Sequence, residues 1–180
     1  MFSLIITIIS IALVAALAVS TLYFGGDSFN RGTAQASAAT MVNQASQIAG
    51  ANTLYAVDNG GTYADVMSDL TEANPSYLAA APRNTDMDGD WSLDGPDSSL
   101  ITASIEKSRV SVCQEINRQA GIASENVDGA TSVTGYDDTS FLIHAADMDG
   151  VDASEVDAQF FCASEEDSNG DITSMTFYFK

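Results

Sequence analysis

The first 24 residues of this 180-residue chain, MFSLIITIISIALVAALAVSTLYF, contain no charged side chain. A helix rises 1.5 Å per residue, so a helix of this length spans about 36 Å and can cross the hydrocarbon core of a bilayer. The Ser and Thr hydroxyl groups can donate to carbonyl oxygens of the preceding turn, so they do not prevent burial. A chain that begins in this way needs lipid or other apolar helices to cover this segment.

The remainder of the chain is strongly acidic. Through Val57 it holds one acid, Asp27, and one base, Arg31, whereas 24 acids and five bases follow. The formal net charge is −19. Because such a surface repels phosphate groups, it disfavours nucleic acids and anionic lipids as partners. We expect a neutral rod followed by an acidic head.

A second helical stretch follows a pair of glycines. Gly25 and Gly26 predict a break or weak point, because each Gly costs about 1 kcal/mol relative to Ala inside a helix. Apolar side chains then recur at spacings of three, four and seven, which predicts an amphipathic helix. They are Ala34, Ala38, Met41, Ala45, Ile48 and Tyr55. The turn residues at 58–61 predict the end of this helix. Residues 1–26 and 27–60 therefore read as two halves of one long helix.

The residues around the apolar segment help to decide whether it is a signal peptide or a membrane anchor. A secretory signal peptide begins with Lys or Arg and has an apolar region of 7–15 residues. A membrane anchor usually has basic residues on its cytoplasmic side. The segment has neither feature, and we expect that a basic leader preceded Met1 and was removed.

Residues 61–180 are expected to form a globular head. Short runs rich in apolar and β-branched residues predict strands at Ser99–Ser104, Ser140–His144, Ala158–Cys162 and Met175–Lys180. Between the first two runs, Val110–Gln119 predicts a helix. A long helix followed by strands predicts an α+β fold, in which the helical rod packs on an antiparallel sheet.

The chain has two cysteines, Cys113 and Cys162. In a chain that leaves the cytoplasm, such a pair suggests one disulfide. Closing a loop of about 50 residues stabilises the fold by about 4 kcal/mol in the chain-entropy model. Two buried free thiols are the alternative, because free cysteine is among the most buried residue types.

Three acidic segments, 84–90, 146–155 and 165–171, begin as calcium-binding loops do. Carboxylates alternate with other residues, and a Gly follows that permits a tight turn. None has the Glu at the twelfth position of an EF-hand loop, so acidic surface turns are the alternative. If one segment binds Ca²⁺, we favour the first, with Asp86, Asp88 and Asp90 as ligands.

No residue pattern typical of an enzyme is present. His144 is the single histidine and lies in an apolar run, so we interpret it as structural. A zinc site or a Ser-His-Asp site has no obvious set of partners, and the haem-attachment and phosphate-loop motifs are absent. We predict that the chain is not an enzyme and needs no cofactor apart from this candidate Ca²⁺.

Four segments carry a resemblance to a known family. After the apolar segment, QIAGANTLYAVDNGGTYADVMSDL is similar to the junction of spine and head in type IV pilins, and PSYLAAAPRNTDMDGDW to the loop that follows. RVSVCQEINRQAGI is similar to the helix with their first cysteine, and QFFCASEEDSNGDITSMTFYFK to their C-terminal end. The whole chain thus resembles type IV pilins, particularly the larger type IVb kind, and the related pseudopilins. This resemblance implies a pilin-like fold with a disulfide-bounded region at 113–162.

The resemblance also implies a function. The apolar helix would hold the protein in the inner membrane before assembly and form the core of an extracellular filament afterwards, with a methylated amino terminus. The expected core residues are Met1, Phe2, Ile5, Ile8, Ile9, Ala12, Leu13, Ala16 and Leu17. The expected partners are further copies of this chain and the pilus assembly machinery. The acidic head would face solvent and serve adhesion, motility or DNA uptake without itself binding nucleic acid.

Two other functions stay open. Family members usually carry a glutamate at the fifth mature position, where this chain has Ile5 if Met1 is the mature terminus. Its absence and the acidic loops favour a pseudopilin of a type II secretion-like apparatus. A membrane-anchored acidic domain that binds Ca²⁺ is the third reading. The nearly charge-free stretch from Ser28 to Val57 argues against it, because a helix exposed to water normally carries Lys and Glu.

Overall fold

The computed structural model describes residues 2–95, 99–123, 133–137, 140–145, 153 and 156–180. Met1, one of the expected core residues, lies outside them. The chain divides into two compact units, Met1–Ala34 and Gln35–Lys180. The fold class is α+β, since one long N-terminal helix precedes a sheet.

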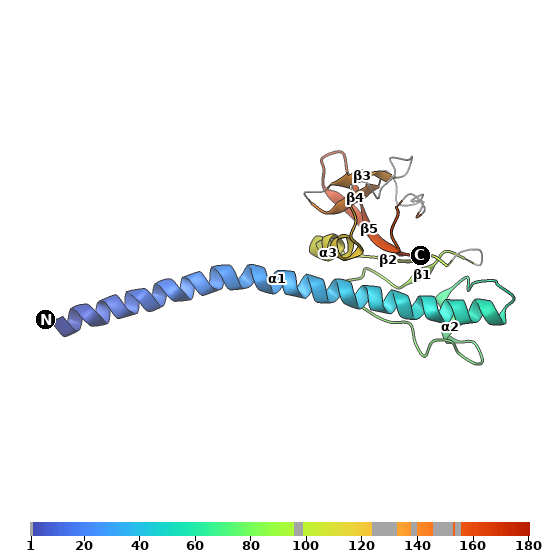
Figure 1. Cartoon of the computed structure of the whole chain (residues 1–180), viewed down its shortest axis with the longest axis horizontal. Coiled ribbons are helices and arrows are strands. Elements are labelled where there is room, and N and C mark those ends of the chain that lie inside the picture. Colours follow the sequence, from blue (N-terminus) through green and yellow to red (C-terminus); the bar gives the residue numbers. More distant parts are fainter. Residues whose placement is uncertain (1, 96–98, 124–132, 138–139, 146–152, 154–155) are drawn as a thin grey trace. The chain divides into compact units, whose positions relative to one another are not determined.

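The N-terminal helix, α1, runs from Phe2 to Asp58 (Figure 1). It ends where the turn residues predict. The N–H group of Gly61 donates to the Ala56 carbonyl at 2.7 Å, and Gly60 and Gly61 have φ angles of 72° and 97°. Such positive φ values favour glycine, which explains why the helix stops here.

The predicted break at Gly25 and Gly26 is wrong, because α1 continues through both residues. Glycine weakens a helix through its backbone entropy, but it keeps the N–H and C=O groups that the helical hydrogen bonds require. Two such residues are tolerated inside a helix of 57 residues, because extending an established helix costs far less than starting one.

The head contains two further α-helices in its described part. Helix α2 is a short element that spans Met67–Thr71. Helix α3 spans Val110–Ala120, as predicted, and follows the 3₁₀ turn η1 at Lys107–Arg109. It ends at Gly121, whose φ of 71° is the left-handed cap that glycine favours.

Six strands of the described residues form one sheet in the order β1-β2-β6-β5-β4-β3. Figure 1 labels five of them, β1 to β5. Their bounds are β1 Ser92–Leu93, β2 Ile101–Ser104, β3 Val133–Asp137, β4 Leu142–Ala145, β5 Phe160–Glu166 and β6 Ile172–Phe179. The four predicted strands correspond to β2, β4, β5 and β6, whereas β1 and β3 were not predicted. Strand β6 lies centrally, between β2 and β5.

The expectation of a purely antiparallel sheet is wrong, because β4 and β5 pair in parallel. Ile143 lies opposite Ala163, and His144 lies opposite Ser164. Parallel neighbours need a crossover connection of about a dozen residues or more instead of a tight turn. Residues 146–159 provide that length. The other four pairs are antiparallel, so the sheet is mixed.

The core of the head lies around the β4–β5–β6 part of the sheet. Ile143, Phe161 and Tyr178 are buried together, and the Phe161 and Tyr178 rings are stacked with centroids 4.7 Å apart. Trp91 meets Phe177 edge to face at 5.9 Å. The first pair joins the neighbouring strands β5 and β6, and the second joins β6 to the residue before β1. Each pair adds roughly 0.5–1.5 kcal/mol beyond burial of its area.

Residues 35–58 of α1 belong to the same unit as the head and bury one stripe of side chains. The fully buried members are Ala38, Met41, Ala45 and Ile48. Two polar side chains fasten this part of the helix: the Gln44 amide donates to the Arg83 carbonyl at 3.0 Å, and the buried Asn52 amide oxygen accepts from the Ala64 N–H at 2.9 Å. The predicted amphipathic stripe is therefore confirmed for this segment.

Candidate functional site

The first candidate site is the apolar surface of α1 from Ser3 to Leu22. This segment is long and apolar enough to cross a membrane, and none of it is buried within the chain. The expected core residues Ile5, Ile8, Ile9, Leu13 and Leu17 expose 53–64% of their surface. Ala12 and Ala16 are also exposed, and nothing is described of the Phe2 side chain. Burying a side chain such as Leu or Ile stabilises by about 1.5–3 kcal/mol, so this surface strongly favours an apolar partner.

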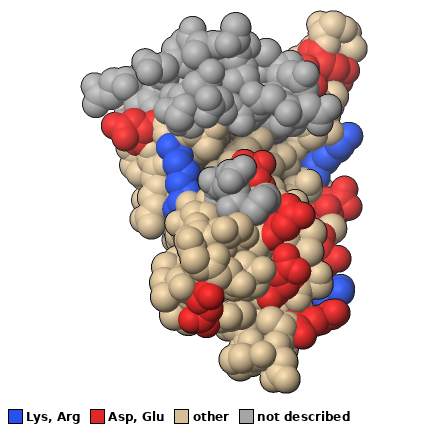
Figure 2. Space-filling model, turned by 90° about the vertical axis from the view of Figure 1, so that its right-hand side faces the viewer, with Lys and Arg blue, Asp and Glu red and all other residues tan. Residues whose placement is uncertain are grey.

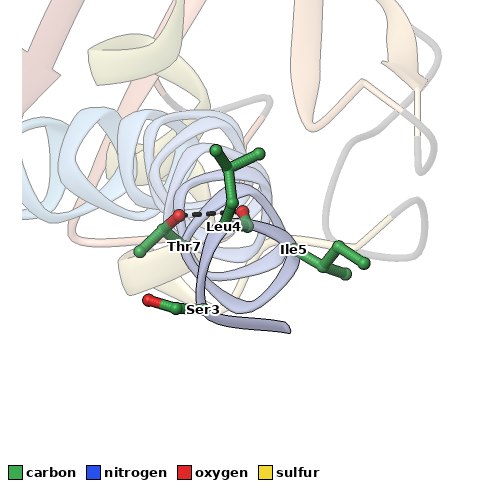
Figure 3. A pocket seen from close by; sticks show the side chains of 4 residues that line it. All are labelled: Ser3, Leu4, Ile5 and Thr7. Atoms are coloured by element: carbon green, nitrogen blue, oxygen red, sulfur yellow. Dashed lines mark hydrogen bonds between the residues drawn. The ribbon is translucent and has the colours of Figure 1, made fainter. Parts of the chain in front are cut away.

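The hydroxyl groups of Thr7, Ser10 and Thr21 donate to carbonyl groups inside the helix. Figure 3 shows Thr7 turned back to the Leu4 carbonyl, to which it donates at 2.8 Å, while Leu4 and Ile5 project from the helix. Ser10 donates to the Ile6 carbonyl at 2.8 Å in the same manner. Because these donors already have partners, they can enter an apolar environment at little cost.

The second candidate site is the disulfide-bounded region of the head. Cys113 on α3 and Cys162 on β5 form a disulfide, and both residues are fully buried. Asn117 reinforces this link. Its amide oxygen accepts from the Cys162 N–H at 2.8 Å, and its amide nitrogen donates to the Cys162 carbonyl at 2.9 Å. The helix is thereby fixed to the sheet by a covalent bond and by a pair of hydrogen bonds.

Asn117 was not singled out as a site residue, although the sequence contains a signal for it. It lies on the same side of the predicted helix as Cys113 and Ile116, and a polar residue on an apolar helix face needs buried partners. Its amide nitrogen also donates to the Phe141 carbonyl at 3.1 Å. Phe141 has a φ of 58°, an uncommon value for a residue with a side chain.

The candidate calcium ligands have other partners in the structure. Asp86 is buried and lies 3.1 Å from the Arg109 guanidinium, and Asp90 lies 3.7 Å from Arg83 on the surface. The Asp88 N–H donates to the Ser104 carbonyl at 2.9 Å, which holds this segment beside β2. Among the described residues no group of three or more His, Cys, Asp or Glu side chains could hold a metal ion. The Ca²⁺ site stays a prediction.

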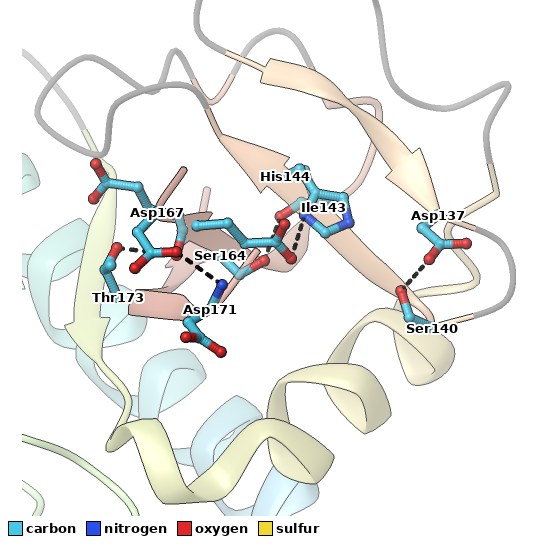
Figure 4. Close-up of polar contacts among 10 residues, drawn as sticks. Asp137, Ser140, Ile143, His144, Ser164, Asp167, Asp171 and Thr173 are labelled. Atoms are coloured by element: carbon cyan, nitrogen blue, oxygen red, sulfur yellow. Dashed lines mark hydrogen bonds and ion pairs between the residues drawn. The ribbon is translucent and has the colours of Figure 1, made fainter. Parts of the chain in front are cut away.

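The third acidic segment forms the turn between β5 and β6 (Figure 4). Its carboxylate Asp167 accepts from the N–H of Asn169 at 2.8 Å and from the N–H of Asp171 at 3.0 Å. The hydrogen bond from Asp171, with that from Asn169, lowers the pKa of Asp167 below its ordinary value. Asp167 thus stabilises the turn. The second acidic segment falls almost entirely outside the described residues.

His144 is half-buried on β4, and its Nδ1 lies 3.1 Å from Glu166 Oε1 on β5 (Figure 4). The hydroxyl groups nearby donate elsewhere: Ser164 to the Ile143 carbonyl at 3.2 Å, and Ser140 to Asp137 at 2.7 Å. Each of these contacts joins neighbouring strands or closes a turn. His144 and Glu166 are partly exposed, whereas Ser164 is fully buried.

Comparison with protein-family models, with curated proteins and with solved structures finds no match to this chain. The proposals below therefore depend on the residues, the geometry and the resemblance noted from the sequence, and on no matched relative. The feature that separates this chain from an ordinary globular protein is the exposed apolar half of α1.

Proposed function

We propose that the protein is the structural subunit of an extracellular filament of the type IV pilus kind. The observation that carries the proposal is the composition of α1. An exposed apolar segment, Ser3–Leu22, continues in the same helix into residues 35–58, which pack into an acidic head. In a filament, the apolar segments of many copies would cover one another and exclude water as a membrane does.

The charge distribution supports the same proposal. All but one of the 25 acids follow Val57, and Figure 2 shows acidic side chains spread over one face with few basic ones between them. Such a surface keeps closely packed copies soluble and faces water readily. The apolar segment contains no charge that burial in a bundle would leave unpaired.

The disulfide supports an extracellular head. Structural disulfides persist in oxidising compartments, and the fully buried Cys113–Cys162 bond fixes α3 to the sheet. The proposed route places the protein in the membrane through Ser3–Leu22 first and in the filament afterwards. Its proposed partners are further copies of this chain and the machinery that extracts them from the membrane.

A membrane-anchored head that never polymerises is the second candidate, since Ser3–Leu22 satisfies the length and composition of a single membrane span. Shearing of intact cells that produce the chain distinguishes the two. A filament subunit is released into the medium in a form that sediments at high speed. A monomeric anchor stays with the membranes and is released only by detergent, which would refute the proposed function.

A further inference from the structure

Two Asn-Gly pairs lie in exposed turns of the unit that contains the head: Asn59-Gly60 at the end of α1, and Asn169-Gly170 between β5 and β6. Such a pair can react with itself, because glycine has no side chain to shield its backbone nitrogen. That nitrogen attacks the asparagine carbon Cγ and loses its proton, and the side-chain nitrogen leaves as ammonia. Water then opens the resulting succinimide ring to aspartate or isoaspartate. The two pairs share this chemistry, so the fold decides how fast each one reacts.

The turn at Asn169 holds every group that the reaction needs. The attacking group, the Gly170 N–H, donates to the Asp167 carbonyl at 3.0 Å. The leaving group, the Asn169 side-chain amide, donates to Asp167 Oδ2 at 3.3 Å, and the Asn169 N–H donates to Oδ1 of the same carboxylate at 2.8 Å. Attack on Cγ requires these hydrogen bonds to break, so the turn protects Asn169.

The turn at Asn59 leaves the attacking group without a partner. Among the described residues the Gly60 N–H donates to no acceptor, whereas the N–H groups on either side of it do. Asn59 donates to the Tyr55 carbonyl at 2.9 Å, and Gly61 donates to the Ala56 carbonyl at 2.7 Å. The Asn59 side-chain amide also donates to the Tyr55 carbonyl, at 2.9 Å. These bonds belong to the last turn of a helix, which opens more readily than the helix interior.

We propose that Asn59 is a site of spontaneous deamidation in the folded protein, whereas its turn protects Asn169. The reaction replaces a hydrogen-bond donor by a carboxylate next to Asp58, whose own carboxylate accepts from the Tyr77 hydroxyl at 2.9 Å. Two adjacent negative charges at the C-terminal end of a helix are unfavourable, because the helix dipole is negative there. The isoaspartate product also adds a carbon atom to the backbone of the turn. Modification therefore loosens the connection between α1 and the segment that follows it.

Peptide mapping of the full chain in detergent tests this site. The chain is incubated in mildly alkaline buffer, and the peptides with Asn59 and Asn169 are followed by mass spectrometry and by labelling with an isoaspartyl methyltransferase. The reduced chain in urea is the matched control, because there neither pair keeps the hydrogen bonds of the fold. We expect similar rates in urea. In the folded chain we expect Asn59 to react roughly tenfold faster than Asn169, the factor that one net hydrogen bond supplies.

A substitution tests the cause of the difference. Asp167→Ala removes the carboxylate that holds Asn169 and leaves the end of α1 unchanged, so it should speed the reaction of Asn169 alone. An unchanged Asn169 rate in this variant would contradict the protection assigned to Asp167. Equal or slower reaction of Asn59 than of Asn169 in the folded wild-type chain would overturn the inference, whether or not the variant folds. The inference does not depend on the proposed filament, whose failure would appear instead as the absence of sedimenting material from sheared cells.

Discussion

Asn117 connects three segments of the head through one amide group. It is fully buried and bonds the N–H and carbonyl groups of Cys162 and the carbonyl of Phe141. In Asn117→Ala, these main-chain groups lose their partner inside the core. A buried group without a partner costs about 1–3 kcal/mol. We expect the free energy of unfolding to fall by about 2–4 kcal/mol, measured by denaturant unfolding of the full chain in detergent.

The matched control for that variant is Gln119→Ala on the same helix. Gln119 is exposed, and its amide donates to the Gln35 carbonyl at 3.3 Å. Its loss should change stability by about 0.5 kcal/mol or less, as surface substitutions usually do. Equal losses in the two variants would contradict the role assigned to Asn117.

Asp167 makes the β5–β6 turn sensitive to acid. Hydrogen bonds from the N–H groups of Asp171 and Asn169 lower the pKa of its carboxyl group. A group with a lowered folded-state pKa stabilises the fold above its unfolded pKa of about 3.9, and this contribution is lost as pH falls through the folded value. Carboxyl NMR titration should give Asp167 a midpoint below 3.9. A midpoint at or above that value would contradict the hydrogen bonding of the turn.

Among the secondary-structure elements, α1 is the one on which the proposed function depends. Ile8 exposes 59% of its surface in the isolated chain and lies in the proposed filament core. Ile8→Asp would place an unpaired charge there or at the centre of a membrane span, which costs about 3 kcal/mol per copy on insertion scales. We expect no filaments from Ile8→Asp and normal filaments from Ile8→Leu, counted by electron microscopy. Normal filaments from Ile8→Asp would refute the core assignment.

The link between α3 and β5 gives a second prediction for an element. Removing the disulfide by Cys113→Ala should lower stability by about 4 kcal/mol, as estimated for a loop of this length in the chain-entropy model. The apolar half of α1 should keep its helicity, because its helical hydrogen bonds are local. Thermal unfolding with circular dichroism checks both statements. An unchanged unfolding midpoint in the variant would show that the disulfide does not form in the native protein.

Elements were predictable where the signal is local. The end of α1 follows from Gly60 and Gly61, and α3 follows from the spacing of Cys113 and Ile116. Strand β3 was missed because VTGYD contains a glycine, which weakens the strand pattern. The parallel pairing of β4 with β5 depends on how the connection crosses the sheet, and a pattern of alternating residues does not encode that path.

The candidate sites also differ in how far the sequence predicts them. The Cys113–Cys162 pair was predictable because a chain with two cysteines can form one intramolecular disulfide. The pairing of Asp86 with Arg109 was not, because it joins residues from separate segments and so depends on the tertiary fold. The acidic spacing alone suggested a calcium loop. Calorimetry with Ca²⁺ tests that prediction: absence of heat and of any shift in unfolding midpoint would refute it.

The whole molecule combines an uncharged apolar segment with a strongly acidic head. The chain has a net charge of −19, yet its apolar segment Ser3–Leu22 is uncharged and has no side chain buried by the described residues. Lipid would cover that segment in a single anchored copy, whereas a filament would cover it with the segments of other copies and leave the acidic heads outside. A single copy held by lipid would be a membrane-anchored domain, whereas many copies held by one another would be a filament. The oligomeric state of the protein at the cell surface therefore distinguishes the two functions.

Immunogold electron microscopy of cells that produce the full chain tests this claim most directly. Antibodies against the acidic head should label long surface fibres of uniform width along their whole length, and Ile8→Asp cells should lack them. Labelling confined to the cell envelope, with no fibres from the wild-type chain, would contradict the filament and identify the apolar helix as the anchor of a single head.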